Sequence, residues 1–237
     1  MNARGRRSTA AFSPGGYFVQ VPPGRVQAEL RACFARWGRP LAVQFDNGNP
    51  WGSCGDLPTP LAAWLIGLGL RVIWIPPRTP QDNGVVERGQ GVAKNWAEPE
   101  RCGSPAELQA RLEAEDRVQR ECYPHAGSAS RLAAYPDLAH SGRPYDAAWE
   151  RANWSWGAVL AYLAGVPVVR RVDCSGKIGL YHEKMYVGAV NRGKEVVLQF
   201  DAGSAEWSVS DRAGVELCRR PLTQFDAAGL CRLPIEW

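Results

Sequence analysis

Between residues 17 and 96, short apolar runs alternate with stretches of helical periodicity, and prolines or glycines separate them. Apolar side chains recur every three or four residues from Val26 to Trp37, which predicts a helix over 25–37. Three short apolar runs predict strands, at 17–21, 41–45 and 71–75. This alternation is typical of an α/β sheet.

Local signals predict where three further helices begin. Thr59 and Pro60 fit the cap and first position of a helix that ends near Gly69. Asp82 fits the cap of a helix over 84–96. Residues 104–107 read Ser-Pro-Ala-Glu, a capping box, and predict a helix that continues towards residue 122.

The chain divides into three predicted sections: 17–122, a connector over 123–165, and 166–237. Within the connector, 123–144 reads as loop and 145–163 as one helix. The last section contains six short alternating runs, which predict a small β-barrel. These runs are 168–172, 178–181, 186–190, 195–200, 207–209 and 215–217.

Composition excludes several classes of protein. With 237 residues, 45% hydrophobic and 22% charged, the chain is expected to fold rather than to be disordered. We expect no membrane span and no secretory signal, since no apolar run approaches the roughly 20 residues of a membrane helix. Seven cysteines without a Cys-x-x-Cys pair favour a reducing, cytoplasmic compartment over a zinc ribbon or disulfide framework. The net charge of +4 is compatible with a polyanionic partner.

Two acidic residues are candidates for chemistry. Asp46 directly follows the predicted strand 41–45, and Glu87 lies in the first turns of the predicted helix 84–96. Carboxylates that converge from a strand end and a helix can hold Mg²⁺ or Mn²⁺. The alternatives stay open, because Asp-Asn-Gly is also typical of a plain turn and a helical glutamate of a solvated surface charge.

Several segments resemble one known family. They are FARWGRP at 34–40, FDNGNPWGS at 45–53, PQDNGVVER at 80–88, and shorter matches at 64–69, 130–136 and 142–145. In this order they resemble the second half of the catalytic core of DDE integrases, and most of all bacterial insertion-sequence transposases, which are related to retroviral integrases. The run 171–188 resembles the small barrel that follows the core in that family.

The resemblance implies an RNase H-like integrase core, a helical connector and a C-terminal SH3-like β-barrel. It also implies Mg²⁺-dependent DNA strand transfer, with two metal ions that activate the attacking group and stabilise the leaving oxygen. Asp46 matches the family's second acid and Glu87 its third, with forty residues between them. Both would be catalytic residues and metal ligands.

The same resemblance implies the partners. Transposon ends and target DNA would bind, and a second copy or a full-length transposase is a further possible partner, in the bacterial cytoplasm at the nucleoid. Four residues near the implied site are candidates for DNA contacts, although solvated charges are an alternative reading of the basic ones. They are Arg78, Asn83, Arg88 and Lys94.

The chain departs from the family at its first acid. That Asp lies on the opening strand of the core, upstream of the predicted helix 25–37, whereas the only acidic residue before Asp46 is Glu29, within that helix. We therefore expect a core without its first strands and an impaired catalytic centre. Two rivals remain, a non-catalytic transposon-derived protein that binds DNA or a transposase, and an inert product whose exposed sheet edge aggregates.

Basic residues in the last section are a second candidate for nucleic-acid contacts. A similar number of acids accompanies them, so a DNA-binding face and an ordinary barrel surface both stay open. The basic residues are Arg170, Arg171, Lys177, Lys184, Arg192, Lys194, Arg219 and Arg220.

Overall fold

The computed structural model describes residues 22–45, 53–54, 57–75 and 84–235, and it combines helices with antiparallel strands. This confirms a mixed composition of helices and strands. The chain forms two compact units. Unit one takes in Met1–Asp46, Ile75–Ala152 and Ile235–Trp237, and unit two takes in Asn47–Trp74 and Asn153–Pro234. The three sections expected from the sequence follow the order of the chain, and that division stays a prediction.

Helix α1 (Pro23–Trp37) confirms the helix predicted near the start of the chain. Its apolar stripe is buried, and Phe34 is 0% exposed. The helix ends at Gly38, whose φ is 75°. A Cβ at this position would lie 2.4 Å from Ser141 Oγ, so both the backbone conformation and the close approach require glycine. Strand β1 (Ala42–Phe45) follows, as predicted.

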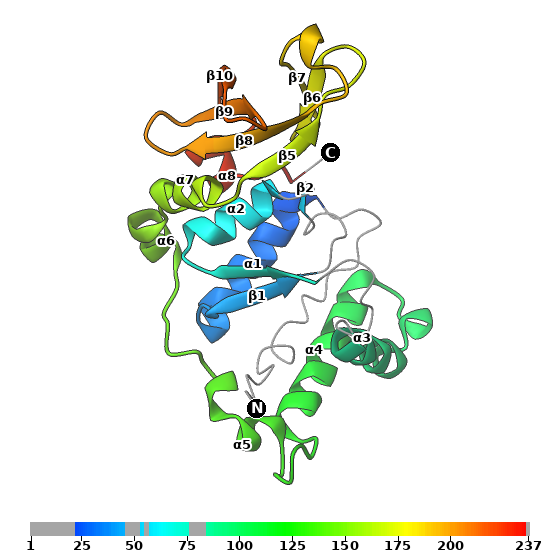
Figure 1. Ribbon diagram of the computed structural model, residues 1–237. Coiled ribbons are helices and arrows are strands. Elements are labelled where there is room, and N and C mark those ends of the chain that lie inside the picture. Colours follow the sequence, from blue (N-terminus) through cyan, green and yellow to red (C-terminus); the bar gives the residue numbers. More distant parts are fainter. Residues whose placement is uncertain (1–21, 46–52, 55–56, 76–83, 236–237) are drawn as a thin grey trace. The chain divides into compact units, whose positions relative to one another are not determined.

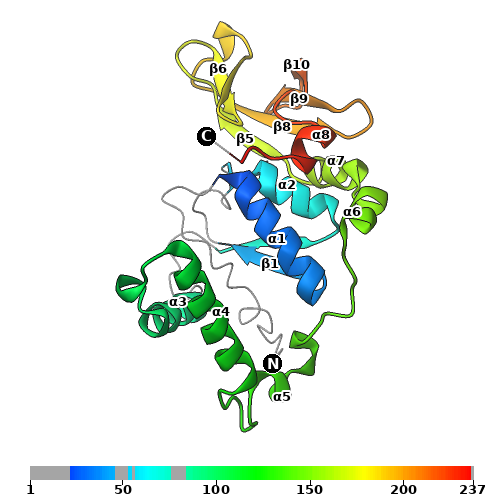
Figure 2. The ribbon, with the colours of Figure 1, turned by 180° about the vertical axis from the view of Figure 1, so that it is seen from behind.

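Helices α3 (Gly84–Ala97) and α4 (Pro105–Glu121) lie side by side in unit one (Figure 2). The capping box of α4 forms: Ser104 Oγ accepts a hydrogen bond from the Glu107 N–H at 3.2 Å. The Glu107 carboxylate in turn accepts from the Gly103 N–H at 2.9 Å. Helix α4 begins where its capping box predicts, because a cap acts within one turn. Helix α3 begins at Gly84 as predicted, and its predicted cap, Asp82, lies outside the described residues.

The remaining helical elements of unit one are short. They are η2 (Pro99–Arg101), α5 (Arg131–Ala134), η3 (Pro136–Leu138) and α6 (Ala147–Asn153). Two of them, α5 and η3, interrupt the predicted loop over 123–144, and Ser130 caps α5 by accepting from the Ala133 N–H at 3.1 Å. Within unit one, α6 is fixed to α1 by an ion pair between Glu150 and Arg31 at 2.6 Å.

A single helix over 145–163 is a wrong prediction, because the chain breaks at Trp154 and Ser155. The Ser155 hydroxyl caps a new helix, α7 (Trp156–Ala164), by accepting a backbone N–H of its first turn at 3.1 Å. The Trp154 indole N–H donates to the carbonyl oxygen of Trp64 at 3.0 Å. Periodicity does not reveal this break, because it depends on the cap at Ser155, and α6 buries a charged residue, Glu150, rather than an apolar stripe.

Helix α2 (Pro60–Gly67) is buried from Leu61 onwards, and it is capped as predicted by Thr59, whose hydroxyl accepts a backbone N–H at 3.3 Å. Short strands flank it. These are β2 (Ser53–Cys54), β3 (Leu57–Pro58) and β4 (Arg71–Trp74). Even this apolar helix is too short to cross a bilayer, and among the described residues no other helix is long and apolar enough to do so.

Four antiparallel strands form the main sheet of unit two, in the order β10, β9, β8, β5 (Figure 1). They are β5 (Val168–Arg171), β8 (Glu195–Asp201), β9 (Glu206–Asp211) and β10 (Glu216–Pro221). A separate hairpin is formed by β6 (Lys177–Leu180) and β7 (Glu183–Tyr186). Helices α7 and α8 (Ala227–Cys231) lie on one side of the sheet.

The predicted closed barrel is not found in the described part of the chain. Strands β5 and β10 are the two edges of the sheet, and β6 pairs with β7 alone. The predicted strand over 186–190 is also wrong. Strand β7 ends at Tyr186, Gly188 turns the chain with a φ of 106°, and a 3-10 helix, η4 (Ala189–Asn191), follows. A left-handed backbone cannot continue a strand ladder, so the pairing stops there.

The core of unit two lies where the sheet meets the apolar sides of α7 and β3. Trp207 and Leu163 are 0% exposed, and the rings of Phe200 and Trp207 meet edge to face across the strand pair at 5.0 Å. Leu57, 0% exposed, belongs to the same cluster. A residue from the first quarter of the chain therefore completes the core of the C-terminal sheet.

Candidate functional site

The two acidic candidates lie at the margins of the described residues. Strand β1 ends at Phe45, and the next residue, Asp46, lies outside them. Glu87 belongs to the backbone of α3, and its side chain lies outside the described residues. For this candidate site, the structure therefore describes the backbone next to each acid and not the positions of the two carboxylates.

One backbone hydrogen bond joins the segments that lead to these acids. The Ile75 N–H donates to the Phe45 carbonyl oxygen at 2.9 Å. Phe45 directly precedes Asp46, and Ile75 directly follows β4 and stands twelve residues before Glu87. The last described residue before Asp46 and the residue that follows β4 thus lie side by side. In α/β sheets, functional residues gather beyond strand ends of this kind.

The described residues do not assemble a two-metal centre. The resemblance implies three carboxylates, and the two that match by motif, Asp46 and Glu87, have side chains outside the described residues. Glu29, the only acid ahead of them, lies on the exposed side of α1. Among the residues whose placement is described, no three His, Cys, Asp or Glu side chains gather into a metal-binding group. We therefore derive no catalytic step through a metal ion.

Of the four residues proposed to contact DNA near this site, only Lys94 has a described side chain. Arg78 and Asn83 lie outside the described residues, and Arg88 is described only as part of the α3 backbone. Lys94 is exposed in the last turn of α3. Its charge there interacts favourably with the partial negative charge of the helix C-terminus.

Exposed aromatic rings lie just beyond Lys94, and no motif in the sequence marks them. Trp96 is 47% exposed and Tyr123 is 50% exposed, and their rings meet edge to face at 6.2 Å. A shallow groove beside them is lined by Trp96, Arg111, Ala114, Glu115 and Val118. The Arg111 guanidinium is held between Glu98 and Glu107, at 3.5 and 2.9 Å. Its charge is therefore already compensated within the protein.

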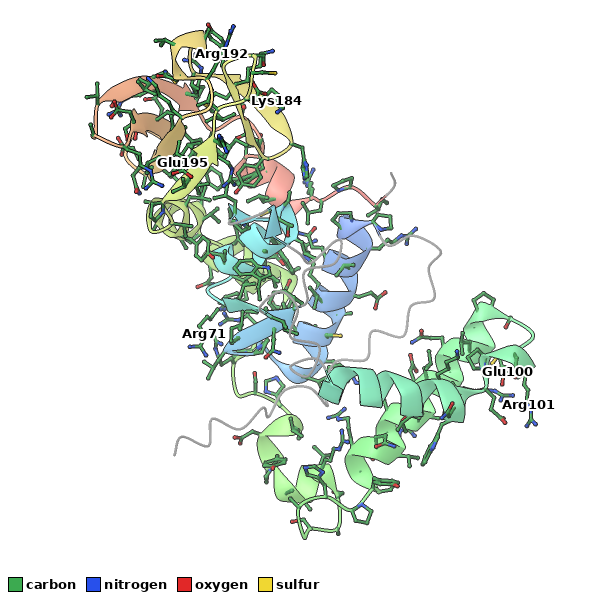
Figure 3. The ribbon with its side chains drawn as sticks, turned by 45° about the vertical axis from the view of Figure 1, so that its right-hand side comes forward. Arg71, Glu100, Arg101, Lys184, Arg192 and Glu195 are labelled. Atoms are coloured by element: carbon green, nitrogen blue, oxygen red, sulfur yellow. The ribbon has the colours of Figure 1, made fainter. Side chains whose placement is uncertain are left out.

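The basic residues of the C-terminal section are unevenly distributed. Six of the eight lie between the start of β5 and the residue before β8: Arg170, Arg171, Lys177, Lys184, Arg192 and Lys194. Figure 3 shows Lys184 and Arg192 at the hairpin end of unit two, with Glu195 closer to the main sheet. Acids dominate the three following strands instead: Glu195, Asp201, Glu206, Asp211 and Glu216. Basic and acidic residues are similar in number over the whole C-terminal section, but the part between β5 and β8 carries an excess of positive charge.

The two basic residues on β10 are of a different kind. Arg219 pairs with Glu216 at 2.9 Å and lies 3.6 Å from an oxygen of Asp201. Arg220 donates to the backbone carbonyl of Arg219 at 2.8 Å. Arg219 is therefore engaged with neighbouring acids. The six basic residues from Arg170 to Lys194 remain as the candidate nucleic-acid surface.

Asp173 organises the turn at the base of this surface. Its carboxylate accepts hydrogen bonds from the Ser175 N–H and hydroxyl and from the Lys177 N–H, at 2.9, 2.7 and 3.0 Å. The Lys184 ammonium lies 3.1 Å from its other oxygen. These donors, Ser175 first, hold the pKa of the Asp173 carboxyl well below its ordinary value. The turn is thus fixed while its carboxylate is ionised.

No model of a known protein family matches this sequence. The resemblance to DDE integrases therefore rests on the ordered motifs themselves. The motif at 45–53 begins at Phe45, whose carbonyl oxygen accepts from Ile75, and the motif at 80–88 begins five residues after Ile75. The run at 171–188 includes the hairpin β6–β7.

Proposed function

We propose that this chain is a DNA-binding protein of the DDE integrase type, built from part of an RNase H-like core and a C-terminal section related to SH3-like barrels. The observation that supports it most is the hydrogen bond between Ile75 and Phe45. It joins the residue before Asp46 to the residue that follows β4, and in α/β sheets functional residues gather beyond strand ends.

The activity that we propose for the residues of this chain is binding to DNA. Strand transfer in this family requires a carboxylate shared by two metal ions. By motif, Asp46 and Glu87 match the second and third of the family's three acids, and Glu29 is exposed on α1. The local excess of positive charge between β5 and β8 supports binding to a polyanion, since neutralising phosphates releases counterions.

Salt-dependent binding without cleavage tests this proposal. We expect a fluorescein-labelled 30-base-pair duplex to bind the full chain at 50 mM KCl and to dissociate as salt rises, with a linear plot of log K against log[KCl]. Incubation of a supercoiled plasmid with 5 mM Mg²⁺ should leave it uncut. Absence of duplex binding at 50 mM KCl would contradict the proposal. Nicking of the plasmid would instead indicate that the chain is an active enzyme.

A second measurement addresses the two acids. Asp46 and Glu87 offer hard oxygen ligands, which suit Mg²⁺ or Mn²⁺. Calorimetric titration with Mn²⁺ should show weaker binding for Asp46→Asn than for the unaltered chain. Glu29→Gln is the matched control, because it removes an exposed acid on α1. Equal binding by all three proteins would count against a residual metal site at these acids.

The rival reading is a protein that binds a full-length transposase. The exposed rings of Trp96 and Tyr123 favour it, because half-exposed aromatic side chains are common at protein interfaces. Trp96→Ser should then weaken co-purification with a transposase that retains all three acids, while duplex DNA binding stays unchanged.

A further inference from the structure

One face of the hairpin β6–β7 is open and carries an aromatic ring between two lysines. Lys177 is paired with Tyr186 across the hairpin, and Gly179 with Lys184. Cross-strand partners and alternate residues of a strand share one face. All four of these residues are exposed. The opposite face supplies Ile178 and other apolar residues to the core of unit two.

The Tyr186 ring is held in place on this face. Its hydroxyl oxygen accepts a hydrogen bond from the Ala189 N–H at 3.1 Å, while the side chain stays 51% exposed. Beside it, Gly179 leaves open space, since a Cβ there would meet nothing within 4 Å. A fixed, half-exposed ring with room next to it is the kind of surface on which a nucleobase stacks.

The charges around the ring favour a polyanion. Lys177 and Lys184 flank it on the same face, and Arg192 lies at the same end of the unit (Figure 3). One acid, Asp173, borders this face and is paired with Lys184 at 3.1 Å. Glu183 belongs to the other face, where it accepts from Gln224 at 2.6 Å.

We infer that this hairpin face binds single-stranded DNA, with one unpaired base stacked on Tyr186 and the adjacent phosphates at Lys177 and Lys184. The inference rests on the proposed function, which supplies DNA as the polymer. A single strand is required because the bases of an intact duplex are already stacked on each other and present no free face to the ring.

Substitutions at Tyr186 separate stacking from charge and from folding. In fluorescence anisotropy with a labelled dT12 oligonucleotide, we expect Tyr186→Leu to weaken binding about tenfold. Tyr186→Phe keeps the ring and should stay within about twofold of the unaltered chain. If the hydroxyl contact with Ala189 were the important feature, the phenylalanine variant would lose as much as the leucine variant, and the inference would fail.

Ligand variants sharpen the test. An abasic oligonucleotide of the same length should bind equally to the unaltered chain and to Tyr186→Leu, because it offers phosphates without bases. Lys177→Gln should reduce the slope of log K against log[salt] by about 0.7 for dT12. Lys184→Gln should reduce it by less, because Lys184 is already paired with Asp173 at 3.1 Å. Tighter binding of rU12 than of dT12 would overturn the assignment to DNA.

Binding to duplex DNA distinguishes this inference from the proposed function. Tyr186→Leu should bind a 30-base-pair duplex as the unaltered chain does. Duplex binding together with a dT12 affinity that Tyr186→Leu leaves unchanged refutes base stacking and keeps the proposed function. Failure to bind either form of DNA refutes both.

Discussion

The Arg31 guanidinium and the Glu150 carboxylate form two hydrogen bonds, at 2.6 and 2.9 Å, across 119 positions of sequence. Arg31 lies on α1 and Glu150 on α6, both in unit one. The Tyr145 hydroxyl donates to the same carboxylate, and burial is the largest cause of a raised pKa for that phenol. Glu150 thus accepts hydrogen bonds from two partners inside unit one.

Loss of this carboxylate should destabilise unit one. The Glu150 side chain is 8% exposed and that of Arg31 is 33% exposed, so the pair is partly screened by solvent. We expect Glu150→Ala to lower the free energy of unfolding by about 2 kcal/mol, measured by urea denaturation. The control is Glu195→Gln, which breaks the ion pair between Glu195 and Arg212. The side chains of both residues are more than half exposed. This substitution should change the free energy of unfolding far less than Glu150→Ala does, because solvent screens an exposed ion pair.

Two aspartates should shift stability in opposite directions with pH. Burial raises the pKa of Asp116 on α4, whereas hydrogen bonds, that from Ser175 first, lower the pKa of Asp173. A raised carboxyl pKa means that the folded state binds the proton more tightly, so ionisation of Asp116 costs stability as pH rises above about 4. A lowered pKa means that ionised Asp173 contributes stability above its unfolded pKa, and this contribution is lost as pH falls.

The corresponding variants test these signs. Asp116→Asn should gain stability relative to the unaltered chain between pH 4 and pH 7. Asp173→Asn should lose stability at pH 7 and approach the unaltered chain as pH falls below 4. Urea denaturation at pH 4, 5, 6 and 7 checks the first variant, and thermal unfolding from pH 3 to 7 checks the second. A parallel response of both variants would contradict the assigned causes.

Two helical glycines should respond oppositely to alanine. A Cβ on Gly67 in α2 would lie 2.3 Å from ring atoms of Trp154, whereas a Cβ on Gly91 in α3 would meet nothing within 4 Å. Gly67→Ala should therefore destabilise the protein by about 1–3 kcal/mol through overpacking. Gly91→Ala should stabilise it by about 0.5–1 kcal/mol, because alanine is the better helix former. Thermal denaturation of both variants measures the two changes in stability. If both variants were stabilised, helix propensity and not the space around each glycine would be the dominant effect.

Lys94 should contribute to duplex binding through charge alone. Its ammonium is exposed in the last turn of α3. Lys94→Gln is expected to reduce the slope of log K against log[salt] by about one, without a change in sequence preference. The control is Arg101→Gln in η2 (Figure 3), since Arg101 already pairs with Glu98 at 2.9 Å. An equal effect of both substitutions would indicate a non-specific dependence on net charge.

The candidate site could be predicted from sequence only as a set of motifs. The sequence indicated Asp46 and Glu87, and the contact between Phe45 and Ile75 brings the segments that lead to them together. It also indicated eight basic residues in the last section without their distribution. Their concentration before β8 and the pairing of Tyr186 with Lys177 depend on strand register, which is set by contacts along both strands.

By itself, the sequence determined the elements whose ends are fixed within one turn. Helices α2 and α4 begin where Thr59 and Ser104 cap them, and Gly38 ends α1. These boundaries follow from local hydrogen bonds and backbone conformations, which a few neighbouring residues specify.

Only the tertiary structure decided how those elements are grouped. Leu57 completes the core of the C-terminal sheet, Trp154 bonds to the backbone of Trp64, and the strands after residue 167 form an open sheet and a hairpin in place of the expected barrel. The physical reason is that apolar burial is non-directional. An apolar residue specifies that it will be buried, and the partners that cover it are selected by packing between segments far apart in the chain.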